Sequence, residues 1–130
     1  MPASSATETA VELVTRFENT FNTYDVDALM ADMTEDCVFE HVAPLAVSFG
    51  RHEGQAAVRA VWESLAVHFP GYQFDIEDIF GAGDRCACRW TMTWRQPEGG
   101  TGSARGVDIF RIRDGKIAEK LTYLTMSAVA

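Results

Sequence analysis

The sequence lacks an apolar run of the length that a membrane-spanning helix needs, which is roughly 20 residues. Its first residues, MPASSATETAVEL, also lack the basic stretch and apolar core of a secretory signal. These two absences predict a cytoplasmic protein with no membrane partner. Basic residues are few, with 11 Lys and Arg against 19 Asp and Glu, and the formal net charge of −8 disfavours binding to nucleic acid.

Cysteine is scarce as well, since the chain contains only Cys37, Cys86 and Cys88. An odd number argues against a disulfide framework. No Cys or His stands at ligand spacing around Cys86 and Cys88, so we expect buried, unreactive thiols and no metal site. A glycine-rich phosphate loop, a GxSxG elbow and an HExxH motif are absent too, and nothing in the sequence requires a cofactor.

The length and the hydrophobic content of the chain are those of one domain. The 130 residues are 47% hydrophobic, enough for a core, and we expect a single domain over 1–130 with a frayed tail at 1–6. Apolar residues at helical spacing predict helices from residue 7, over 23–33 and over 54–69. Asp25 is expected to cap the second helix, and the segment from Pro44 to Glu53 is expected to be a loop.

Strands are predicted where apolar and polar residues alternate with a period of two, which is typical of a sheet with one buried face. One strand is expected at 37–43 and four more after Gly71, joined by hairpin turns. The fold class is therefore α+β. We expect a cone-shaped, curved antiparallel or mixed sheet wrapped by three helices from the N-terminal half, an α+β barrel.

Asp108 interrupts an apolar strand face. In RGVDIFRIRDGK it shares that face with Phe110 and Ile112, which should match the face of Trp90 on the neighbouring strand. Burying a bare carboxylate costs several kcal/mol unless its pKa rises or a hydrogen-bonded partner is present. Asp108 is therefore either an acid on the floor of a pocket or a structural residue that steadies the core.

His41 is the second candidate, because on its strand it shares a face with Phe39, which should point to the core. Histidine transfers protons near neutral pH and can also pair with a buried carboxylate. We interpret His41 and Asp108 as catalytic candidates in one pocket, with a purely structural pairing as the alternative. His52 and His68 look ordinary. The expected ligand-contacting residues are Phe17, Trp62, Trp90, Phe110 and Tyr123.

Three segments, FNTYDVDALMADMTEDCVFE, GRHEGQAAVRAVWESL and RGVDIFRIRDGKIAEK, resemble the SnoaL-like branch of the nuclear-transport-factor-2-like superfamily. The resemblance extends over about residues 11–126. It implies a cone of sheet and helices, a deep apolar pocket, and homodimers packed through the outer face of the sheet. Members of this branch and its relatives include polyketide cyclases, ketosteroid isomerases, limonene-type epoxide hydrolases and non-catalytic ligand binders.

Compared with a ketosteroid isomerase, the resemblance places Asp108 at the position of an acid kept protonated by an apolar site. It places His41 at the general base and Phe17 at the oxyanion-hole tyrosine. The epoxide hydrolases need two aspartates, and the last strand, AEKLTYLTM, contains none. The resemblance thus implies cyclase- or isomerase-like acid–base chemistry on a small apolar or aromatic carbonyl compound, without a cofactor. A non-catalytic binder of small hydrophobic ligands, an epoxide hydrolase-like enzyme and a protein-interaction module are the alternatives.

Overall fold

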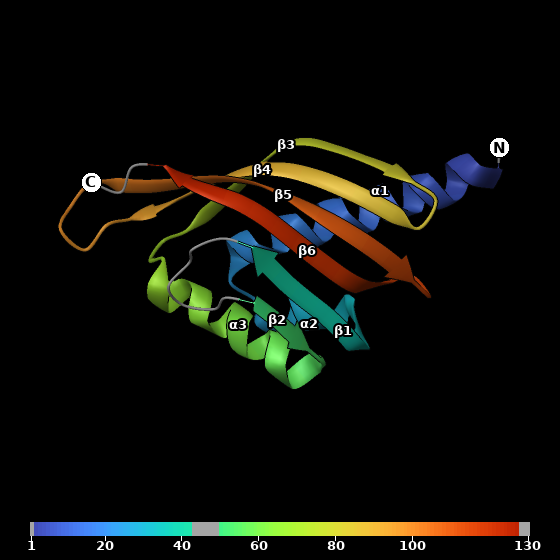
Figure 1. The fold of residues 1–130 in the computed structure, drawn as a ribbon, viewed down its shortest axis with the longest axis horizontal. Coiled ribbons are helices and arrows are strands. Elements are labelled where there is room, and N and C mark those ends of the chain that lie inside the picture. The colour runs from blue at the N-terminus through green and yellow to red at the C-terminus, as the bar shows by residue number, and fades with distance from the viewer. Residues whose placement is uncertain (1, 43–49, 128–130) are drawn as a thin grey trace.

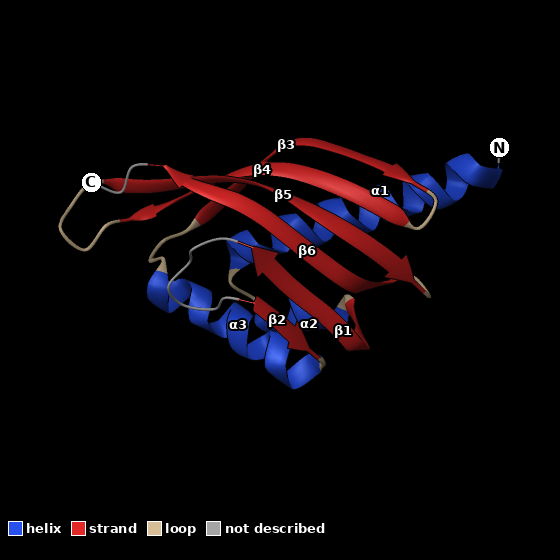
Figure 2. Ribbon diagram, in the orientation of Figure 1, coloured by secondary structure: helices blue, strands red, loops and turns tan. Residues whose placement is uncertain are grey.

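The computed structural model describes residues 2–42 and 50–127. Within them the chain forms three α-helices, a short 3-10 helix and six strands (Figures 1 and 2). In chain order the elements are α1 (Pro2–Thr20), η1 (Phe21–Thr23), α2 (Val26–Ala31), β1 (Met33–Val42), β2 (Gly50–Glu53), α3 (Gln55–His68), β3 (Gln73–Ala82), β4 (Arg85–Arg95), β5 (Thr101–Arg113) and β6 (Lys116–Ser127).

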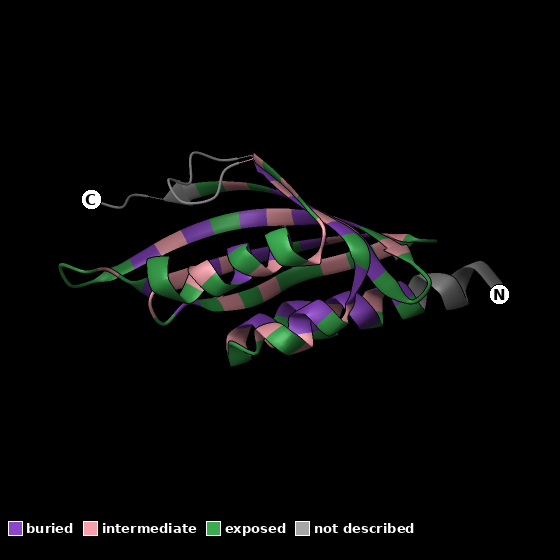
Figure 3. Ribbon diagram, turned by 90° about the horizontal axis from the view of Figure 1, so that it is seen from below, coloured by how far each residue is buried: buried purple, intermediate pink, exposed green. Residues whose placement is uncertain are grey.

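The strands form one sheet in the order β2-β1-β6-β5-β4-β3. All neighbours are antiparallel except β1 and β6, which are parallel and lie far apart in the sequence. The helices cover one face, where α1 packs against β3 and β4 and α3 packs against β1 and β2 (Figure 3). The predicted α+β class and curved mixed sheet are confirmed, although the sheet stays open and does not close into a barrel.

The helices bury the stripes that their sequences predict. The predicted stripe of the first helix is buried at Ala10, Leu13, Val14 and Phe17, and it continues to Phe21 in η1. The Asp25 side chain caps α2 by accepting a hydrogen bond of 3.0 Å from the Ala28 amide. Helix α1 begins at Pro2, inside the expected tail, and proline is well tolerated in a first helical turn. In α3 the expected stripe is narrower, because Ala57 is exposed.

The pairing of β4 with β5 places the aromatic face of one strand over small and acidic residues of the other. Trp90 lies opposite Gly106, and Cys88 lies opposite Asp108. The inward residues of β4 are buried, as predicted: Cys86, Cys88, Trp90, Met92 and Trp94. All cysteines of the chain are free and buried, which confirms the expectation of buried thiols.

Two predictions of the local structure are wrong. The last four residues of the expected loop form β2, which pairs with β1 and places His52 opposite Phe39; residues 44–49 of that loop lie outside the described residues. In β3 a period of two predicts that Phe80 shares the buried face of Phe74 and Ile76. The register instead shifts between Ile76 and Asp78, so that Ile79 packs on the core and Phe80 is 63% exposed. A bulge of this kind reverses the phase of a strand, and a simple alternation does not reveal it.

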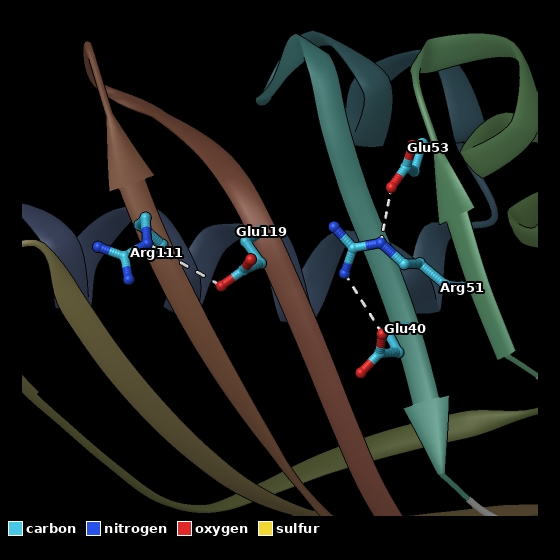
Figure 4. A network of polar contacts seen from close by, with 5 residues as sticks. All are labelled: Glu40, Arg51, Glu53, Arg111 and Glu119. Carbon is cyan, nitrogen blue, oxygen red and sulfur yellow. Dashed lines mark hydrogen bonds and ion pairs between the residues drawn. The ribbon is translucent and has the colours of Figure 1, made fainter.

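The outer face of the sheet is charged. Figure 4 shows Arg51 between Glu40, at 3.3 Å, and Glu53, at 2.6 Å, and a weaker pair of Arg111 with Glu119 at 4.0 Å. Exposed pairs of this kind contribute at most about 1 kcal/mol each. The buried chemistry therefore lies on the inner face, against the helices. No helix among the described residues has the length and apolar character of a membrane span.

Candidate functional site

A cavity of about 60 Å³ lies between the helices and the inner face of the sheet. Most of its wall is apolar, largely Phe and Trp. Five polar residues also line it: Glu18, His41, Asp108, Lys120 and Thr122. A cavity that binds benzene measures about 150 Å³. In this conformation the space therefore fits a group of a few heavy atoms, and a ring would require the aromatic walls to move.

Asp108 is 1% exposed and is held by two residues of β6. The Thr122 hydroxyl donates to its Oδ1 over 2.6 Å, and the ammonium of Lys120 lies 3.4 Å from its Oδ2. Lys120 also donates to Thr122 Oγ1 over 3.0 Å. The three side chains meet because Asp108 pairs with Thr122 in the β5–β6 register, which directs both residues inward. The buried carboxylate is thus matched by a cation and a hydroxyl, which offsets its desolvation.

Glu18 joins this cluster from helix α1. Glu18 is 5% exposed, and its carboxyl interacts with Asp108 and with the thiol of Cys88. Burial, and secondly the negative charge of Asp108, raise the pKa of Glu18 well above its usual range. Burial, followed by the charge of Glu18, also raises the pKa of the Cys88 thiol, which is therefore inert. The same burial favours the neutral, hydrogen-bond-donating form of the Glu18 carboxyl.

Three aromatic rings lie close to the ammonium group of Lys120. Its Nζ lies 4.7 Å from the centre of the Phe39 ring, 5.2 Å from Trp62 and 5.7 Å from Phe21. Each distance is within the range of a cation–π interaction, which is worth more when the cation is desolvated. Lys120 is only 6% exposed, so the carboxylate and the rings replace most of its water.

His41 is 3% exposed, and its ring stacks on Phe39 with 5.0 Å between centroids and faces His52 at 6.4 Å. Neither ring nitrogen has a hydrogen-bond partner among the described residues. Burial, then the charge of Lys120 and then His52, lower the pKa of His41 to about 4. The imidazole is therefore neutral at pH 7 and has a free lone pair. The indole N–H groups of Trp62 and Trp90 are likewise buried and unpartnered.

The structure brings most, but not all, of the predicted site residues to the cavity. Asp108, His41, Trp62 and Trp90 line it. The alternative, a structural pairing of His41 with Asp108, is not seen: Asp108 is paired with Lys120 and Thr122, and both His41 nitrogens are unpartnered among the described residues.

Phe17 and Phe110, both expected to contact the ligand, lie behind the cavity wall. Their rings pack edge to face with centroids 6.1 Å apart, and both residues are fully buried. They support the aromatic wall without forming it.

Tyr123 was expected to point inward, and this expectation is wrong. It lies opposite Val107 on the outer face and is 44% exposed. The inward residues of this part of β6 are Lys120, Thr122 and Leu124, because the parallel pairing with β1 sets Lys120 beside Phe39. A strand whose buried face contains Lys and Thr is assigned the opposite phase by hydropathy alone.

Sequence reasoning missed Glu18, Lys120 and Thr122, and it took His52 for an ordinary loop residue. One signal for Glu18 was available. It follows Val14 by four residues and precedes Phe21 by three, so it lies on the apolar stripe of α1. A carboxyl at that position must be buried with the stripe.

The fold and the site together define the class of protein. Three helices on one face of a curved, open, six-stranded mixed sheet form the architecture of the nuclear-transport-factor-2-like fold. The sequence profile of the SnoaL-like domain family matches residues 14–120, and the chain belongs to this family.

Solved structures of similar fold carry different names. An NTF2-like protein from Mesorhizobium loti is 35% identical, with a TM-score of 0.72 and coverage of 92% of this chain and 93% of that one. A Jannaschia sp. CCS1 protein named as a SnoaL-like polyketide cyclase is 21% identical, with a TM-score of 0.78 and coverage of 91% and 86%. An M. tuberculosis LEH-like epoxide hydrolase is 21% identical, with a TM-score of 0.75 and coverage of 92% and 84%. No protein of curated function matches the sequence.

Proposed function

We propose that the protein is an enzyme that performs acid–base chemistry on a small apolar carbonyl compound without a cofactor, in the manner of a cyclase or isomerase. The observation that carries the proposal is His41, whose two nitrogens are buried and unpartnered on the wall of the cavity. An unsatisfied buried polar group costs about 1–3 kcal/mol, so a bound ligand is the natural partner.

In the proposed reaction, neutral His41 removes a proton from the carbon next to the carbonyl. A low pKa does not disqualify the base, since the aspartate base of ketosteroid isomerase has a pKa of only about 4.6. The negative charge that develops on the carbonyl oxygen needs donors. The groups on the cavity wall that can donate are the unpartnered indole N–H groups of Trp62 and Trp90, and the Glu18 carboxyl, whose raised pKa favours its protonated form.

The sequence suggested Asp108 as the buried acid. We instead assign that role to Glu18, with Asp108 beside it. Asp108 lies in an ion pair with Lys120, whereas the pKa of Glu18 is raised by burial and by Asp108. In this proposal Glu18 holds the proton that a general acid donates, and Asp108 holds Glu18 and Lys120 in place. The epoxide hydrolase alternative loses support, because Arg105 pairs with Glu77 on the outer face at 3.2 Å.

Proton abstraction can be tested without the natural substrate. Acetone or butanone is incubated with the protein in D₂O, and deuterium entry next to the carbonyl is followed by NMR. We expect His41→Gln to slow the catalysed exchange by about 10²–10⁴-fold, the usual contribution of a positioned acid or base. His68→Gln, at an exposed histidine, is the matched control and should exchange at the wild-type rate. Equal exchange by His41→Gln and wild type would refute the proposal.

A non-catalytic binder is the second candidate, favoured by one observation: the charges of Lys120 and Asp108 neutralise each other. The two functions separate in one experiment, in which the ketones are titrated against the fluorescence of the cavity tryptophans. Saturable quenching together with no acceleration of deuterium exchange would support the binder. Quenching with exchange that depends on His41 would support the enzyme.

A further inference from the structure

Lys120 has a property that the proposed acid–base chemistry does not use. It is a primary amine on the wall of an apolar cavity, held with 6% exposure between a carboxylate and three aromatic rings. We propose that Lys120 is a nucleophile that condenses with a small aldehyde or ketone to form an imine. This inference goes beyond the proposed function and does not require His41 to act as a base.

The surroundings of Nζ are built for one positive charge. Asp108 Oδ2 lies 3.4 Å away, and the centres of the Phe39 and Trp62 rings lie about 5 Å away. A protonated imine carries the same single charge on the same nitrogen. The groups that stabilise the ammonium therefore also stabilise the iminium, and the reaction leaves no new charge uncompensated in the low-dielectric site.

The proton-accepting groups are next to the amine. Thr122 Oγ1 lies 3.0 Å from Nζ and donates its own proton to Asp108 over 2.6 Å, so the hydroxyl and the carboxylate can together take a proton from the ammonium. The freed amine adds to the carbonyl carbon, and the C=O bond becomes a C–OH bond in a carbinolamine. The nitrogen loses a second proton in this sequence.

The second half of the reaction expels water. The carbinolamine oxygen is protonated and leaves as H₂O while the nitrogen lone pair forms the C=N bond. In total, Lys–NH₃⁺ and O=CR₂ give Lys–NH⁺=CR₂ and H₂O, with both protons of the water coming from the original ammonium. No oxidant or reductant takes part. An apolar wall excludes the water that would hydrolyse the product, and the cavity volume favours short alkyl carbonyl compounds.

The chain provides its own control, because it has only two lysines, Lys116 and Lys120. Lys116 is exposed. The folded protein is incubated with butanal and sodium cyanoborohydride, which reduces an imine to a stable butyl amine, and the label is located by peptide mass mapping. Simple accessibility would favour Lys116. A nucleophilic Lys120 should instead be labelled about tenfold faster or more, since the cavity orients amine and aldehyde together.

Variants define the outcome further. Lys120→Arg keeps a cation and should lose the cavity label while Lys116 still reacts. Asp108→Asn removes the carboxylate that takes the proton and should slow the labelling of Lys120 without changing that of Lys116. Faster labelling of Lys116 than of Lys120 in the folded wild type, or no label on Lys120, would overturn the proposal.

The acid–base proposal and the imine proposal can be refuted independently of each other. His41→Gln should still be labelled at Lys120, so trapping that persists when deuterium exchange is lost shows that the amine reacts independently of the base. Absence of trapping with His41-dependent exchange intact would reject the imine and leave the acid–base function standing.

Discussion

Lys120 and Asp108 form a buried ion pair between neighbouring strands, with Nζ and Oδ2 3.4 Å apart and side chains only 7% and 2% exposed. Both charges have lost most of their water, so each depends on the other. Removal of one partner leaves an uncompensated charge in the core, whereas removal of both does not. The stability of the fold therefore depends on the same two charged groups that line the cavity.

Lys120→Met should destabilise the protein by about 3–5 kcal/mol, the usual result of breaking a buried pair. The double variant with Asp108→Asn should lose clearly less than the sum of the two single variants, because no charge is then left unpaired. Urea denaturation of the four proteins gives the coupling free energy. Additive losses would show that the two groups do not interact.

Thr122→Val removes the hydroxyl that donates to Asp108 over 2.6 Å while keeping the shape of the side chain. Hydrogen bonds to charged groups contribute about 1.5–3 kcal/mol, and a loss of that size is expected in the free energy of unfolding. Thr125→Val is the control on the same strand, since Thr125 is exposed. A loss no larger than that of the control would mean that the short bond contributes nothing.

The stability of the protein should fall as the pH is lowered from about 6.5 to about 4. In the folded state burial and the charge of Lys120 lower the pKa of His41 from 6.5 to about 4, so the unfolded chain binds the proton first in this window. The contribution at neutral pH is about 3 kcal/mol, from the two pKa values and 1.36 kcal/mol per unit. It is complete above pH 6.5 and lost below about pH 4.

The contribution of His41 is isolated by comparing the wild type with His41→Phe in urea denaturation between pH 4 and pH 7. The raised pKa of Glu18 acts with the opposite sign but is present in both proteins. The difference in stability should therefore change across the window, while His68→Phe, at an exposed site, should follow the wild type. A pH-independent difference between wild type and His41→Phe would rule out a neutral buried imidazole.

Gly106→Ala should damage the pocket wall. A Cβ atom at this position would lie 2.5 Å from Cζ2 and 2.7 Å from Cη2 of Trp90, so the indole would have to move. Overpacking of this kind costs about 1–3 kcal/mol. We expect a loss of that size on urea denaturation and weaker ketone quenching of the cavity tryptophans. Unchanged stability and quenching would mean that Trp90 has room to shift without consequence.

A homodimer through the outer sheet face stays a prediction. The half-exposed Tyr123 lies beside Val107 on that face, in a shallow depression between Arg89 and Arg105. Light scattering coupled to size exclusion should give the mass of a dimer, and Tyr123→Glu should shift it toward the monomer. A wild type that elutes as a monomer at high concentration would reject this interface.

The sequence predicted β4 and β5 well, because most of their buried residues are large and apolar. Trp90 and Phe110 set the phase of β4 and β5, and Asp108 and His41 were found because each shares a face with such a residue. The same logic failed for β6, where the inward residues include Lys120 and Thr122. Their burial depends on partners from other elements, and no local pattern contains that information.

The limits are clearest in β3 and α1. The bulge before Asp78 reverses which side chains of β3 point to the core, and no residue type in the sequence marks its position. Glu18 lies on the apolar stripe of α1. A carboxyl is accommodated there because it interacts with Asp108, which lies ninety residues later in the sequence. Polar clusters assembled from distant segments are therefore the part of the site that sequence reading is least able to supply.

The parallel pairing of β1 with β6 has a consequence for synthesis of the chain on the ribosome. A nascent polypeptide that ends after β5 already contains Glu18, His41 and Asp108, but not the strand that delivers the lysine and threonine. Until β6 emerges, the edge of β1 stays unpaired and the acidic groups have no counter-ion. Strand β6 thus completes the described sheet only after the other five strands are made, and native contacts this far apart are expected to form slowly.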